Sequence, residues 1–204
     1  MAWQTDPSHT RIEFTARHMM LSKVRGEFQE FDIDFRLDPE RPEVASVEAR
    51  IKTASVNTRD VQRDGHLRSP DFFKSDEFPE MVFKSARVER TGEKTAKLHG
   101  NLTIRDITRP VVLDVQYLGT SKSPWGATSV GFEASTRINR EDWDLTWNVA
   151  LETGGWLVGK EVIISIETEF VAQPANVQEP SAVDSMRAGD TVTASEQATP
   201  VAVN

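Results

Sequence analysis

The feature that most constrains this chain is an apolar–polar alternation with a period of two residues, repeated along most of its length. Residues 11–18 (RIEFTARH) place Ile12, Phe14 and Ala16 on one side, opposite charged and polar residues. Because successive side chains of a β-strand point to opposite faces, this pattern predicts a strand with one buried face. The alternation recurs in residues 31–37, 46–52, 97–104, 130–138 and 162–170, and residues 81–88 and 110–118 fit two further strands.

A change of phase predicts how these strands close on themselves. The apolar positions are even from Val24 to Phe28 and odd from Phe31 to Leu37. A bulge or bend near Gln29-Glu30 would keep both sets on the same face of one long strand. Sharply bent strands are typical of sheets that curl into barrels.

Two segments break the alternation and predict short helices. Residues 57–69 have Asn57 or Thr58 as the N-cap and Gly65 as the end of a helix. Residues 139–151 have Asn139 as the N-cap and predict one or two helical turns followed by a loop. With no internal repeat, the chain is expected to be all-β: a small antiparallel barrel of about eight strands with one or two short helices.

The composition divides the chain of 204 residues into one domain and a tail. Residues 1–172 carry the strand pattern, whereas residues 173–204 are rich in Ala, Ser, Thr, Pro and Val and contain no aromatic residue. Such a segment buries too little apolar surface to offset its ordering entropy, so a disordered tail is expected.

The charge and the residue types exclude several classes of partner. The net charge of −8 argues against nucleic acid and anionic membrane surfaces as main partners. Arg11, Arg17, Lys23 and Arg25 form a small basic cluster, which is interpreted as an ordinary solvated face. The absence of cysteine excludes zinc–thiolate sites and cysteine nucleophiles, and the four histidines show no ligand spacing, so no metal is expected.

The ends and the hydropathy of the chain give an expectation about its location. Residues 1–20 contain no apolar run of the kind found in signal peptides, and no segment has the length of a membrane span. A cytoplasmic protein without stable membrane insertion is therefore expected.

A tryptophan-rich segment, residues 142–162, carries the most unusual local composition. Its GGWLVGK run is one residue short of a phosphate-binding loop, because Glu161 stands where a Ser or Thr would hold magnesium. The run also opens an alternating strand rather than a helix, which argues against a nucleotide site. Gly154 and Gly155 would let the chain turn sharply into the last strand.

Short motifs spread over residues 3–170 form a specific set. They are W-x-x-D-P-x-H-T-x-I-x-F-x-x-x-H from Trp3 to His18, SVNT at 55–58, SPDFF at 69–73, GNLTIRDITRPV at 100–111 and LTWNVALETGGWLVG at 145–159. Together they resemble the YceI-like family of bacterial polyisoprenoid-binding proteins. The chain departs from that pattern at Trp143-Asp144, where Phe-Gly is usual, and at Asp106, where Gly is usual.

The resemblance implies a lipocalin-like barrel that binds a long isoprenoid, such as a polyprenyl quinone or a polyprenyl phosphate-like lipid, and often a homodimer. It implies no catalytic set and no cofactor. Two alternatives stay open: an enzyme that acts on a lipid head group in the same cavity, and a structural barrel that acts through protein partners.

The candidate ligand-binding residues follow from strand parity and from the aromatic segment. Parity places large and small apolar residues on the inward faces, which would leave a tunnel. Helical spacing directs two tryptophans to one end of that tunnel, and a third lies nearby, although all three would equally serve as core that plugs the barrel end. The full set is Phe14, His18, Phe28, Phe35, Ala49, Phe83, Leu102, Phe132, Ala134, Trp143, Trp147 and Trp156.

Overall fold

A computed structural model describes residues 3–38 and 41–172 of the chain. The predicted tail, residues 173–204, lies outside the described residues. The elements, in chain order, are β1 (Trp3–Thr5), η1 (Pro7–His9), β2 (Arg11–His18), β3 (Ser22–Phe28), β4 (Phe31–Arg36), η2 (Pro42–Val44), β5 (Ser46–Lys52), η3 (Thr53–Ser55), β6 (Val56–Asn57), α1 (Val61–Arg68), β7 (Glu80–Arg90), β8 (Thr95–Ile104), β9 (Ile107–Lys122), β10 (Thr128–Asn139), η4 (Arg140–Trp143) and β11 (Val158–Ala172). The η elements are single 3₁₀ turns.

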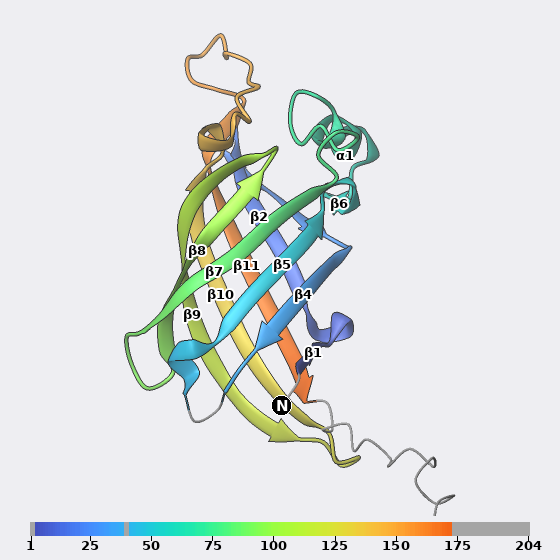
Figure 1. The fold of residues 1–204 in the computed structure, drawn as a ribbon. Coiled ribbons are helices and arrows are strands. Elements are labelled where there is room, and N and C mark those ends of the chain that lie inside the picture. Colours follow the sequence, from blue (N-terminus) through green and yellow to red (C-terminus); the bar gives the residue numbers. More distant parts are fainter. Residues whose placement is uncertain (1–2, 39–40, 173–204) are drawn as a thin grey trace, which may run out of the picture. The chain divides into compact units, whose positions relative to one another are not determined.

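The strands form one curled antiparallel sheet with the lipocalin-like barrel architecture expected from the sequence (Figure 1). Hydrogen-bonded neighbours follow the order β4-β5-β7-β8-β9-β10-β11-β2-β3-β6, and β1 pairs with β11 beside this path. Most neighbours in space are neighbours in sequence, so hairpin turns make most of the connections.

The bend predicted at Gln29-Glu30 is confirmed, and it joins the two ends of the sheet order. β3 pairs with β2, whereas β4 pairs with β5 at the other end. Hydrogen bonds fix the bend: the Gln29 N–H donates to the Ser55 carbonyl over 3.2 Å, and the Glu30 N–H donates to Ser55 Oγ over 3.1 Å. The chain therefore crosses from one end of the sheet to the other within two residues, which curls the sheet into a barrel.

The described residues form eleven strands rather than the eight expected. The bend divides one predicted long strand into β3 and β4, and the short strands β1 and β6 were not predicted. β1 connects β11 to β4. It pairs with β11, and Thr5 Oγ1 donates a hydrogen bond to the Ile33 carbonyl in β4 over 3.0 Å.

The predicted boundaries of the first helix are wrong. Its N-cap is Asp60, whose carboxylate accepts a hydrogen bond from the Arg63 N–H, and Gly65 lies inside the helix. Thr58 instead donates its N–H and its hydroxyl to the buried carboxylate of Asp64, over 2.8 and 2.6 Å. A tertiary hydrogen bond thus moves the start of the helix by two residues.

The predicted N-cap at Asn139 is confirmed, but the helix that follows is a single 3₁₀ turn. It ends at Asp144, which has a left-handed backbone conformation (φ 59°). Asp106, in the β8–β9 turn, has φ 62°. Both positions where the family pattern carries glycine therefore have the conformation that glycine adopts most easily.

Candidate ligand-binding site

A long apolar cavity of about 690 Å³ occupies the barrel lumen. The even-numbered residues of β2 and β10 and the odd-numbered residues of β4 and β5 line it, as the alternation predicted. Residues from β7, β8, β9 and β11 complete the wall. The barrel is therefore not filled by its own side chains, and the remaining space suits an elongated apolar ligand.

Eight of the twelve candidate residues line this cavity, and they come from seven different strands. They are Phe14, Phe28, Phe35, Ala49, Phe83, Leu102, Phe132 and Ala134. The other four candidates, His18, Trp143, Trp147 and Trp156, are not among the lining residues.

The three tryptophans build the end of the barrel instead of the wall of the lumen. Trp143 is 2% exposed, and its indole N–H donates to the Leu102 carbonyl over 3.0 Å. The Trp147 ring packs edge-on against His66, with ring centres 4.4 Å apart, and against Phe72 at 5.5 Å. Because the 3₁₀ turn ends at Asp144, helical spacing does not continue to Trp147, and that part of the prediction is wrong.

These contacts join two segments that are far apart in sequence at one end of the barrel. The α1 segment and the loop 144–157 both lie at the upper end in Figure 1. Leu67, Phe72 and Phe73, from the α1 segment and the loop after it, line the lumen there. Sequence reasoning missed them because they lie outside the alternating strands, although SPDFF was part of the family pattern.

Arg140 supplies a buried cation at the same end. The side chain is 4% exposed and lines the cavity. Its Nε–H donates to the Gly159 carbonyl over 3.1 Å, and its terminal nitrogens donate to the Leu145 and Val158 carbonyls. All three acceptors are neutral, and burial lowers the pKa of Arg140. The guanidinium ties the loop 144–157 to the barrel and places a positive charge beside an apolar lumen, where the charge of Glu141 partly opposes the lowering of its pKa.

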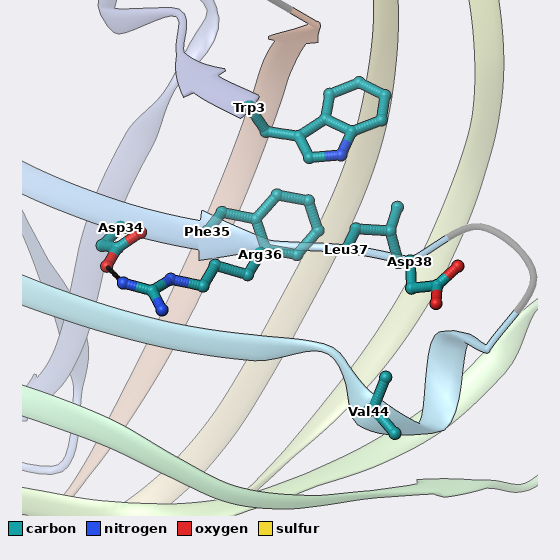
Figure 2. Close-up of a pocket in the computed structure, with 7 residues that line it drawn as sticks. All are labelled: Trp3, Asp34, Phe35, Arg36, Leu37, Asp38 and Val44. Carbon is teal, nitrogen blue, oxygen red and sulfur yellow. Dashed lines mark hydrogen bonds and ion pairs between the residues drawn. The ribbon is translucent and has the colours of Figure 1, made fainter. Parts of the chain in front are cut away.

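Trp3 is a further lining residue that the candidate set lacks. It lies between the lumen and a second pocket of about 450 Å³, which is formed beside β4 and η2 and also touches Phe35 and Leu37 (Figure 2). The indole nitrogen of Trp3 is buried and has no hydrogen-bond partner among the described residues. A buried N–H without an acceptor is rare in native proteins, so the lumen wall contains one unused hydrogen-bond donor.

Two glycines expected to widen the tunnel do not do so. A Cβ at Gly26 would lie 2.5 Å from the Phe14 ring, and a Cβ at Gly100 would lie 2.5 Å from the Phe83 ring. The aromatic rings therefore occupy the space that the missing side chains leave. The cavity depends on alanines such as Ala49 and Ala134, which line it directly.

The polar chemistry of the lumen is sparse. The ionisable lining residues besides Arg140 are Glu13, Tyr117 and the group Arg90, Glu93 and Lys94 around the β7–β8 hairpin. Acid–base catalysis usually depends on polar groups that converge in the pocket, whereas most of the described lining is apolar.

One three-residue group in the described part of the chain is close enough to hold a metal ion: Asp6, His9 and Glu169. It lies outside the lumen lining. Asp6 caps η1, and its pKa is lowered to about 2 by hydrogen bonds from Ser8 and His9. His9 Nδ1 lies 2.8 Å from the Asp6 carboxylate, so an ion pair already accounts for these two residues.

Comparison with known proteins agrees with this geometry. A family model described as YceI-like domain matches residues 3–170. The UPF0312 protein SA2479 of Staphylococcus aureus is 38% identical over 166 residues, which cover 81% of this chain and 94% of that protein.

Solved structures give the same fold. A Campylobacter jejuni YceI protein has a TM-score of 0.68 and 30% identity, over 78% of this chain and 90% of that one. A polyisoprenoid-binding domain from Saccharophagus degradans has a TM-score of 0.59 and 15% identity, over 85% and 99% of the two chains. In residues 3–38 and 41–172, no helix has the length and apolar character needed to span a bilayer.

Proposed function

The chain belongs to the YceI-like family, and from this premise and the apolar lumen we propose that it binds one long-chain isoprenoid lipid inside the barrel. The observation that carries the proposal is the continuous apolar cavity of about 690 Å³, lined from both ends of the barrel. The ligand would be carried, stored or shielded from water. A polyprenyl quinone is the class that fits best, because it combines a long apolar chain with a head group that accepts hydrogen bonds.

The energetics favour an extended hydrocarbon chain. Burying ten CH₂ groups contributes on the order of 8 kcal/mol, from which association entropy and ligand ordering subtract a sizeable part. A chain of several isoprene units therefore reaches tight binding from apolar contacts alone. The eight inward candidate residues are the proposed contacts. Among their phenylalanines, Phe14 and Phe132 are half-buried and the others are buried.

The proposed function is binding rather than catalysis. The sparse polar lining supports binding over an enzyme that acts on the lipid head group. The open lumen supports binding over a structural barrel, since a dry barrel would fill its interior with side chains. A cytoplasmic location and a homodimer remain predictions.

Native mass spectrometry of the purified protein, followed by organic extraction, tests the proposal directly. We expect a co-purifying apolar ligand in about one copy per chain. Ala134→Leu adds volume to the lumen and should remove the ligand while the protein stays folded. Ser135→Leu, one residue along and on the exposed outer face, is the matched control and should keep the ligand.

Two results would contradict the proposal. The first is full ligand occupancy in folded Ala134→Leu protein, which would place the lipid outside the lumen. The second is a strong loss of stability in Ala134→Leu without any ligand in the unchanged protein, which is the behaviour of an overpacked core.

A further inference from the structure

The turn between β2 and β3 has an unfavourable backbone conformation for its residues. The Leu21 N–H donates to the His18 carbonyl over 3.0 Å, and the two central residues, Met19 and Met20, have φ of 52° and 60°. A hairpin turn with positive φ at both central positions strongly favours Asn-Gly, because side chains with a Cβ are strained there. Two methionines at these positions therefore reduce the stability of the hairpin.

The same turn exposes apolar side chains to solvent. Met20 is 65% exposed and Leu21 is 81% exposed. The Met19 N–H donates to the Leu157 carbonyl over 2.8 Å, which places the turn beside the half-exposed Trp156. The turn and the adjoining loop thus form one apolar tip at the α1 end of the barrel.

Unpaired cations flank this tip. Arg17 lies directly opposite Lys23 in the β2–β3 ladder, and Arg25 follows two residues further along β3. All three are exposed, and none of their side chains forms an ion pair or a hydrogen bond among the residues that the structure describes. Like charges directly opposite each other in a ladder are destabilising, so this is a further local feature that the fold does not explain.

Acidic residues of the same ladder offset the charge only at its far end. The Glu13–Glu27 pair is two residues from Arg25, about 7 Å along the strand, but four residues from Arg17 and Lys23, about 13 Å. The second separation exceeds the Debye length of about 8 Å at physiological ionic strength, so the two cations next to the turn keep their charge. Glu152, in the neighbouring loop, sets one negative charge against the three cations.

We propose that this turn, with Met19, Met20 and Leu21 at its tip and Arg17, Lys23 and Arg25 behind it, docks on the surface of an anionic lipid bilayer. Apolar side chains that enter the headgroup region beside cations that attract anionic lipids are the two elements of peripheral membrane binding. Local features that oppose stability are typical of functional surfaces. The basic cluster therefore has a role beyond solvation, although the chain as a whole is acidic. This docking does not depend on what the lumen holds.

Vesicle co-sedimentation tests the proposal with the full chain. Vesicles of phosphatidylcholine alone are compared with vesicles of equal parts phosphatidylcholine and phosphatidylglycerol. We expect binding to the anionic vesicles only, and weaker binding at high salt. Lys23→Thr/Arg25→Thr should lower the apparent affinity about 30-fold, since each basic residue near an anionic surface contributes about fivefold.

The central variant is Met19→Asn/Met20→Gly. It gives the turn its favoured residues, so the protein should unfold at a higher denaturant concentration, while vesicle binding should fall by about tenfold or more. A gain in stability excludes misfolding as the reason for lost binding.

Two variants are matched controls and should bind anionic vesicles like the unchanged protein. Lys84→Thr/Arg87→Thr makes the same change in net charge on β7. Trp125→Ser removes a 91% exposed aromatic residue from the β9–β10 turn, at the opposite, lower end of the barrel in Figure 1.

Three outcomes would overturn the proposal. The unchanged protein fails to bind anionic vesicles, or Met19→Asn/Met20→Gly binds them equally well, or Trp125→Ser loses binding while the turn variant keeps it. Loss of a dimer in Met19→Asn/Met20→Gly, without vesicle binding by the unchanged protein, would instead assign the tip to a contact between two copies of this chain. Ligand occupancy of the lumen, measured on the same samples, separates each outcome from failure of the proposed function.

Discussion

The buried indole N–H of Trp3 distinguishes ligands by their head groups. Trp3 lines the lumen, and its nitrogen has no acceptor among the described residues. A lipid with a hydroxyl or carbonyl oxygen would supply the missing acceptor, whereas a pure hydrocarbon would not. The lumen is therefore expected to prefer oxygen-bearing isoprenoids to hydrocarbons of similar size.

Trp3→Phe tests this preference because it keeps an aromatic ring and removes only the donor. We expect geranylgeraniol to bind about fivefold more weakly to the variant, which corresponds to about 1 kcal/mol for one hydrogen bond. Squalene should bind to both proteins equally. Competition against a fluorescent lipid measures both affinities, and an equal loss for the two ligands would mean that the indole contributes shape alone.

The ion pair between Asp6 and His9 links the stability of the N-terminal segment to pH. The hydrogen bond to Asp6, followed by the charge of that carboxylate, raises the pKa of His9 above its ordinary value. A group with a raised pKa in the folded state stabilises the fold below the pKa of its unfolded state, about 6.5, and loses that contribution as the pH rises through the folded value.

NMR titration of the His9 ring is the measurement. We expect its midpoint above about 6.5, and Asp6→Asn should lower the midpoint. Glu169 and Ser8 are the other groups near this pair. The pKa of Asp6 is lowered to about 2, so the contribution of its carboxylate to folding stability is present at neutral pH. That contribution is lost as the pH falls from about 3.8, the ordinary value, through about 2. An unchanged His9 midpoint in Asp6→Asn would contradict the assignment.

At the scale of elements, two glycines with opposite roles test how the strands and the helix are packed. A Cβ at Gly100 in β8 would lie 2.5 Å from Phe83 and 2.6 Å from the Lys84 carbonyl oxygen, and a backbone atom cannot move aside cheaply. A Cβ at Gly65 in α1 meets nothing within 4 Å. The close approach of Phe83 and the Lys84 carbonyl thus requires a glycine at position 100, whereas no neighbouring atom requires one at position 65.

The expected changes in the free energy of unfolding have opposite signs. Gly100→Ala should lose about 1–3 kcal/mol through overpacking. Gly65→Ala should gain about 0.5–1 kcal/mol, because alanine restricts the unfolded chain and favours the helix. Urea denaturation of the two variants checks both values. A neutral Gly100→Ala would show that the Phe83 ring and the strand adapt without strain.

At the scale of the whole molecule, an apolar lumen makes stability depend on the proposed ligand. A ligand in the cavity of about 690 Å³ would give the lining residues packing partners that neighbouring side chains do not supply. A ligand at about 100 times its Kd adds about 2.7 kcal/mol to the free energy of unfolding. Protein stripped of lipid by organic extraction and refolded should therefore melt at a lower temperature than the purified protein.

Calorimetry of loaded and stripped samples measures the difference. Adding geranylgeraniol to the stripped protein should reverse most of the decrease in the thermal midpoint. Ala134→Leu is the internal control, since its filled lumen should show a smaller difference between the two states. Equal midpoints for loaded and stripped unchanged protein would argue that the lumen contributes nothing to lipid binding.

The sequence by itself determined the strands, their inward faces and the bend that curls the sheet. Period-two alternation is a local property of each strand, so parity correctly placed residues such as Phe14, Ala49 and Phe132 toward the lumen. The change from even to odd apolar positions at Gln29-Glu30 likewise indicates a bend, because a bend keeps both sets of apolar side chains on the same face. N-capping at Asn139 was also predictable, because the capping side chain and the Glu141 N–H that donates to it lie two residues apart.

Only the tertiary structure decided the ends of the barrel. Trp143 is not a lumen-lining residue, and its N–H bonds a carbonyl 41 residues away. The Arg140 guanidinium bonds carbonyls on two other segments. The direction of a side chain outside a regular strand depends on the partner that it packs against, and that partner is set by the fold rather than by neighbouring residues. For the same reason, the unused donor of Trp3 and the direct pairing of Arg17 with Lys23 behind an exposed apolar turn became visible only once the strands were paired.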